Sequence, residues 1–127
     1  MSHFNHYTCK LNVEDLKELT PIFQSLSTQF NLELVERQVV SNSYYLSVFM
    51  LLALKGDIPP IGFTLGTNDT LNLTVDWETN HGGTNQKTTE VYTTLINQLA
   101  EYRTKKALAE ATSVAQKHGA NVNVIVH

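Results

Sequence analysis

Three residues near the N-terminus carry side chains that bind soft metal ions: His3, His6 and Cys9. Their spacing of three residues would place them on one face of a helix, as a set suited to zinc or copper. The segment His3 to Leu11 instead alternates in a way that predicts a β-strand, on which residues three apart point to opposite faces. We therefore predict no metal site, since a strand separates these side chains and a fourth protein ligand is missing.

A second group with chemical potential consists of Asp76, Glu78 and His81, which precede the turn Gly82–Thr84. Carboxylates and an imidazole beside a loop are common in catalytic sites. No nucleophile motif such as G-x-S-x-G accompanies them, and the glycine pair lacks the Lys and the spacing of a phosphate-binding loop. We therefore expect no catalytic residues and a protein that is not an enzyme.

The length, composition and net charge of the chain indicate what kind of protein it is. It has 127 residues, 42% of them apolar and 17% charged, which indicates one globular domain spanning 1–127. The net charge of −3 argues against nucleic acid as a partner. Cys9 is the only cysteine, so no internal disulfide forms. The longest apolar run, Tyr44 to Leu54, falls far short of the ~20 residues of a membrane span. We expect a soluble intracellular protein without a cofactor.

Hydrophobic periodicity predicts the elements of the first half. A strand from His3 to Leu11 is followed by Asn12, which is expected to cap a helix. Pro21 is expected to kink this helix or to divide it into two short ones. Leu32 to Val40 predicts a second strand, and Tyr44 to Leu54 a third that is buried on both faces.

A hairpin is the clearest pattern of the chain. Ile61–Leu65 and Thr70–Trp77 each alternate with a period of two on either side of a polar turn. This register places Phe63 and Trp77 on the covered face of the sheet. Asn80 to Lys87 is polar and glycine-containing, which predicts an exposed loop.

One long helix is predicted from Thr88, the expected N-cap with Thr89, to the C-terminal stop signal at Gly119. Its apolar positions change sides near Arg103, so the helix either bends there or reaches beyond its own core. The first stripe consists of Val91, Leu95, Leu99 and Tyr102, and the second of Ala107, Leu108, Ala111, Val114 and Ala115. A last strand is predicted from Asn121 to Val126.

This order of elements predicts an α+β fold. It consists of an antiparallel sheet of about five to six strands, with an N-terminal helix and one long C-terminal helix packed on one face.

Several short segments also carry a family resemblance: Met1–Phe4, Ile61–Phe63, Leu73–Trp77, and Tyr102 in a helix that ends at Gly119. In these segments and in the order of its elements, nearly the whole chain resembles the hypothetical chloroplast reading frame thirty-five proteins of plastids and cyanobacteria, a family of unknown function. The resemblance implies a cyanobacterial cytoplasm or a plastid stroma, and it implies no established activity.

Two functions from different classes fit these observations. The first is a non-catalytic interaction or assembly factor that docks a protein partner or a second copy of itself through the second helical stripe, at Leu108, Ala111 and Val114. The alternative is a binder of a small molecule or cofactor. It would use a cavity between the sheet and the long helix, lined by Tyr7, Tyr44, Trp77 and Tyr102.

Overall fold

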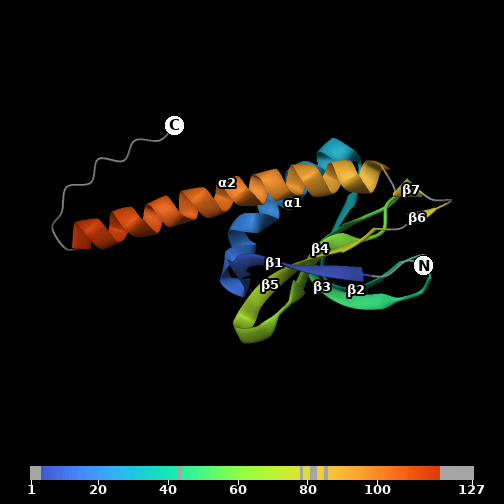
Figure 1. Cartoon of the computed structure of the whole chain (residues 1–127), viewed down its shortest axis with the longest axis horizontal. Coiled ribbons are helices and arrows are strands. Elements are labelled where there is room, and N and C mark those ends of the chain that lie inside the picture. The colour runs from blue at the N-terminus through green and yellow to red at the C-terminus, as the bar shows by residue number, and fades with distance from the viewer. Residues whose placement is uncertain (1–3, 43, 78, 81–82, 85, 118–127) are drawn as a thin grey trace. The chain divides into compact units, whose positions relative to one another are not determined.

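The computed structural model describes residues 4–42, 44–77, 79–80, 83–84 and 86–117 (Figure 1). The chain separates into two compact units, residues 1–95 and 96–127. The first unit contains a five-stranded antiparallel sheet, helix α1 and the first turns of helix α2, and the later turns of α2 belong to the second unit. The predicted α+β class, with one N-terminal helix and one long C-terminal helix, is confirmed.

The strands of the main sheet lie in the order β1-β5-β4-β3-β2, and all neighbours are antiparallel. Two further short strands, β6 and β7, pair with each other. The helices and strands are β1 Phe4–Asn12, α1 Leu16–Phe30, β2 Glu33–Ser41, β3 Ser47–Lys55, β4 Ile61–Leu65, β5 Thr70–Asp76, β6 Thr79–Asn80, β7 Gly83–Thr84 and α2 Gln86–Lys117, with 3-10 turns at Val13–Asp15 and Thr67–Asp69.

The β4–β5 hairpin is the prediction that the structure confirms most directly. Phe63 pairs with Leu73 across the two strands, and both side chains are fully buried. Trp77 follows the end of β5 and is half-buried against Tyr92 of α2, with ring centroids 4.8 Å apart. The period of two therefore identified the covered face correctly.

Helices α1 and α2 cover the same face of this sheet within the first unit. Phe63, Leu73 and Tyr7 form one cross-strand row, so their side chains share a face. The ring of Phe23 from α1 lies 5.3 Å from that of Phe63. The ring of Tyr92 from α2 lies 6.1 Å from that of Tyr7 at the other end of the row.

Helix α1 is not divided at Pro21. A kink or two short helices were expected there, and the division into two helices is wrong, because one helix runs from Leu16 to Phe30 with Pro21 inside it. Proline in a helix removes one backbone donor. Burial of Leu19, Phe23 and Leu26 on the sheet side outweighs that loss.

Helix α2 begins earlier than predicted. Its first residue is Gln86, and Thr88 is a fully buried residue inside the helix, not its N-cap. Thr88 lies on the same buried stripe as Val91 and Leu95, so its side chain packs inward as part of the helix and does not cap its end. The segment Asn80 to Lys87, expected to be a loop, includes part of β6, all of β7 and the helix start.

The end of the long helix is described as far as Lys117. The expected stop at Gly119 and the expected strand Asn121–Val126 lie outside the described residues. Of the first apolar stripe, Val91, Leu95 and Leu99 are buried and Tyr102 is half-buried. In the part of the chain that the structure describes, no helix is both long and apolar enough to cross a membrane.

Candidate functional site

The β2–β3 hairpin bends in its middle, and the bend shapes the surface around it. Arg37 adopts a left-handed conformation (φ +50°) inside β2, where a regular strand has none. Val35 and Val40 are an odd number of residues apart, yet both are buried in one cluster with Met50 and Ala53. In both β2 and β3, the residues that face the cluster therefore change from one set of alternate positions to the other near Arg37. Phe4, at the opposite edge of the sheet, packs against this cluster.

Asn42, directly after β2, ties the bent hairpin to the centre of the sheet. Its side chain is buried, and its Nδ2 donates to Oδ2 of Asp76 at 2.8 Å. Its Oδ1 accepts the backbone N–H groups of Tyr44 and Leu46, both at 3.0 Å. A single side chain therefore holds the turn between β2 and β3 and fixes it to the end of β5.

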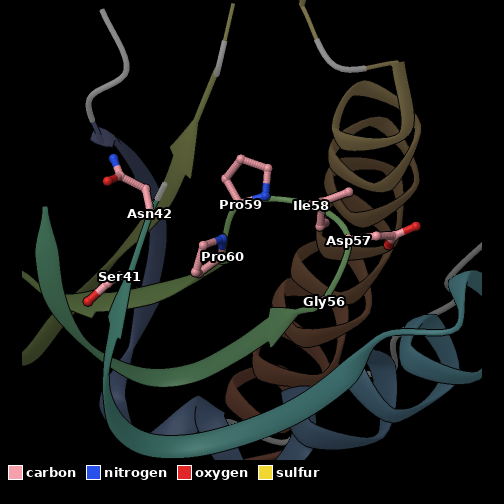
Figure 2. A pocket seen from close by; sticks show the side chains of 7 residues that line it. All are labelled: Ser41, Asn42, Gly56, Asp57, Ile58, Pro59 and Pro60. Atoms are coloured by element: carbon pink, nitrogen blue, oxygen red, sulfur yellow. The ribbon is translucent and has the colours of Figure 1, made fainter. Parts of the chain in front are cut away.

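Two neighbouring hollows open beside this turn. The first, of about 360 Å³, lies between the end of β2 and the β3–β4 loop (Figure 2) and is lined by Ser41, Asn42, Gly56, Asp57, Ile58, Pro59 and Pro60. The second, of about 350 Å³, shares four of these residues and adds Glu33, Val39, Val40 and Lys55. Asn42 is a buried polar residue at these hollows, and both its Oδ1 and its Nδ2 already form hydrogen bonds within the protein.

Charged groups at the hollows are paired with each other. The Lys87 ammonium contacts both carboxylate oxygens of Asp57, at 2.7 and 2.9 Å. This hydrogen bond and the positive charge of Lys87 hold the pKa of Asp57 below its ordinary value of 3.8. At the second hollow, Lys55 lies 3.9 Å from Glu33. The hollows therefore offer no net charge to attract an ionic ligand.

The outer face of the hairpin carries a large exposed apolar surface. Val39 and Phe49 are cross-strand partners whose side chains point away from the buried cluster, and the turn adds three more apolar residues. The exposed fractions are 65% for Val39, 54% for Tyr44, 90% for Tyr45, 46% for Leu46 and 48% for Phe49. We call these five residues the hairpin patch. Tyr45 also has a left-handed backbone (φ +61°), which is unfavourable for a bulky residue.

The predicted third strand is thereby corrected at its beginning. Tyr44, Tyr45 and Leu46 were expected inside a strand buried on both faces, but β3 starts at Ser47 and these residues form the turn. Burial on both faces is limited to Met50–Leu54.

Of the four aromatic residues predicted to line a cavity, the structure brings two together. Trp77 Nε1 donates to the Tyr7 hydroxyl at 2.8 Å, and Tyr92, which was not among the predicted residues, packs on both rings. Partial burial, and to a lesser degree Tyr7, raise the pKa of Tyr92 above its ordinary value of 10.0. Tyr44 lies in the β2–β3 turn, and Tyr102 lies in the second unit.

Of the residues considered as metal ligands, His6 and Cys9 lie on β1, as predicted. Nδ1 of His6 lies 2.7 Å from the Thr74 hydroxyl, and the Cys9 thiol donates to the Leu71 carbonyl at 3.1 Å. His3 lies outside the described residues. No group of three or more His, Cys, Asp or Glu side chains within the described ranges is arranged to hold a metal ion.

The group considered for acid–base chemistry is described only in part. Asp76 is fully buried and bonded to Asn42, whereas Glu78, His81 and Gly82 lie outside the described residues. Gly83 and Thr84 form β7.

The predicted partner surface on α2 is accessible. Ala111 is exposed, Val114 is 58% exposed and Leu108 is half-buried.

The hairpin patch was missed because a largely apolar run such as Tyr44 to Leu54 is typical of a buried strand. One signal was present: Ser41, Ser43 and Ser47 flank the tyrosines, and Asn42-Ser43 is typical of a turn. Comparison with known proteins adds no relative, since no family model, curated protein or solved structure matches the chain. The family resemblance therefore stays a prediction.

Proposed function

We propose that this chain is a non-catalytic protein-interaction or assembly module whose binding surface is the hairpin patch. The observation that carries the proposal is the exposure of five large apolar side chains on one bent hairpin. Exposed apolar side chains gathered on one hairpin of a folded domain are typical of contact with another protein.

The composition of the patch supports a protein partner over a polar ligand. No charged residue occurs between Val39 and Leu54, and three of the five patch residues are aromatic. Charge depletion with Tyr and Phe enrichment is characteristic of the buried centre of protein interfaces. The nearest polar groups, Ser41 and Ser47, bond to each other through their hydroxyls at 2.7 Å.

The test is affinity capture from native extract with the full chain and two serine variants. Phe49→Ser removes a patch residue, and Leu65→Ser removes an equally exposed apolar residue at the end of β4. We expect Phe49→Ser to lose the captured protein and Leu65→Ser to retain it. Identical capture by both variants would contradict the assignment of the patch.

A second surface for the same function is the later half of α2, with Leu108, Ala111 and Val114. Its support is the exposure of Ala111 and Val114 on a helix that presents small apolar side chains. Leu108→Glu should weaken association, while Ala109→Glu, at an exposed position next to it, serves as control. Loss of folding in Leu108→Glu would show that this residue belongs to a core instead.

The aromatic contacts at Tyr7, Trp77 and Tyr92 favour one alternative function, the binding of a small molecule or cofactor. Aromatic side chains that combine an apolar ring with a polar group commonly line ligand sites. Trp77 is the only tryptophan, so its fluorescence reports on this cluster alone. A fragment library screened by NMR should yield ligands that also change Trp77 emission. Absence of any such ligand would end this alternative.

The proposed location, a cyanobacterial cytoplasm or a plastid stroma, rests on the family resemblance. Fractionation of the source cells with an antibody against the chain would test it.

A further inference from the structure

The hairpin patch has a composition that permits it to face a copy of itself. Its cross-strand pair, Val39 and Phe49, lies on the outer face of the strands, while Val40 and Val48 occupy the inner face. A two-fold interface places the same surface on both sides, so any charge in the patch would meet its own sign. The hairpin patch contains no charged residue, so a two-fold contact brings no like charges together.

The area of the patch is sufficient for a dimer. At about 200 Å² for each aromatic side chain, the exposed fractions of Tyr44, Tyr45 and Phe49 leave roughly 400 Å² of aromatic surface. Val39 and Leu46 bring the patch toward the upper end of the roughly 300–600 Å² of the largest apolar patch on a typical monomer. Two such patches would bury about 1,100 Å² together, above the roughly 1,000 Å² that a specific interface needs.

The edge of the sheet indicates how far association can proceed. β2 is an edge strand, and an open edge can pair with further strands without limit. It is protected by the exposed charge of Glu33 at its start, by those of Glu36 and Arg37 in its middle, and by the left-handed backbone at Arg37. Charges and an irregular backbone at an edge oppose strand addition. Addition of further strands at β2 is therefore disfavoured, and a two-fold contact through the hairpin patch would use the same surface of both copies and leave none for a third.

We infer that the partner of the hairpin patch is a second copy of this chain, with the two hairpins related by a two-fold axis near their turns. This inference rests on the proposed function, because it names the partner of the proposed surface. The exposed ring of Tyr45 then lies near the axis, where burial against its counterpart offsets its unfavourable backbone conformation.

The experiment is sedimentation equilibrium of the full chain across a hundredfold range of concentration. We expect a mass that rises from 14.3 kDa toward twice that value and no larger species. Tyr45→Ser and Phe49→Ser should each raise the dissociation constant at least tenfold, while Leu65→Ser leaves it unchanged. A mass of 14.3 kDa at every concentration would overturn the inference, as would equal association of all three variants.

A cysteine variant keeps the test decisive if Phe49→Ser fails to fold. Tyr45 is almost fully exposed, so Tyr45→Cys removes no buried contact, and the native Cys9 is buried. Mild oxidation should join Tyr45→Cys copies into a covalent dimer, whereas Leu65→Cys copies stay single. A monomeric chain whose affinity capture still depends on Phe49 would reject the second copy and keep the proposed function. Capture that is independent of Phe49 would reject the hairpin patch as the binding surface, and with it this inference.

Discussion

Asn42 is the residue whose replacement should reveal most about the bent hairpin. Asn42→Ala removes at least three hydrogen bonds at once: the bond donated to Asp76 and the two accepted from the backbone of Tyr44 and Leu46. Each such bond contributes about 0.5–1.5 kcal/mol net. We therefore expect the free energy of unfolding to fall by about 3 kcal/mol, a large share of the 5–15 kcal/mol typical of a domain.

Urea denaturation followed by far-UV circular dichroism measures this loss. Gln38→Ala, at an exposed position of the same hairpin, is the control and should change the free energy of unfolding by less than ~0.5 kcal/mol. Asn42→Asp keeps an acceptor for the turn but replaces the donor that faces Asp76, and it should also be destabilising. A loss below about 1 kcal/mol for Asn42→Ala would refute the view that this side chain holds the hairpin in place.

Three further predictions concern the core, an ion pair and the N-terminal strand. Leu73 is fully buried, so Leu73→Ala should lower the free energy of unfolding by ~2–5 kcal/mol in denaturant melts, and a loss below ~1 would show that the site is not core. The pKa of Asp57 is lowered, so the Lys87 contact stabilises the fold above pH 3.8 and its contribution disappears as the pH falls through the lowered pKa. An NMR titration should find that pKa below 3.8 and near its ordinary value in Lys87→Ala. Elemental analysis of untagged protein should find no stoichiometric zinc, and one equivalent that is lost in His6→Ala would contradict the strand interpretation.

Strict alternation made the β4–β5 hairpin predictable from the residues. Ile61, Phe63, Leu71 and Leu73 face a core that helices cover, and a register shifted by one residue would turn all four away from that core. The start of α2 was not predictable in the same way. Threonine is a common N-cap residue, which made Thr88 a reasonable expected helix start. Thr88 is buried because the helix packs closely on the sheet, and that packing distance cannot be read from a single sequence.

The candidate site was the least predictable part. Whether Tyr44 to Leu46 enter a strand or a turn depends on the bonds that Asn42 makes to their backbone. The orientation of the Asn42 side chain in turn depends on its bond to Asp76, which lies 34 residues away in the sequence. The hydrophobic pattern of a short segment cannot predict such a distant partner. Exposure of the hairpin patch also requires the left-handed residue Arg37, whose type gives no hint of that conformation.

The strand order has a consequence for how the chain acquires its structure. β2, β3, β4 and β5 are each paired with a sequence neighbour, so their hairpins need only short loops to close. β1 pairs with β5, and its His6 bonds to Thr74 across 68 residues. During synthesis β1 therefore leaves the ribosome early and stays unpaired until β5 has been made. The slow step of folding should be the addition of this strand to an existing meander, and an N-terminal truncation should remove that kinetic phase while leaving the hairpins able to form.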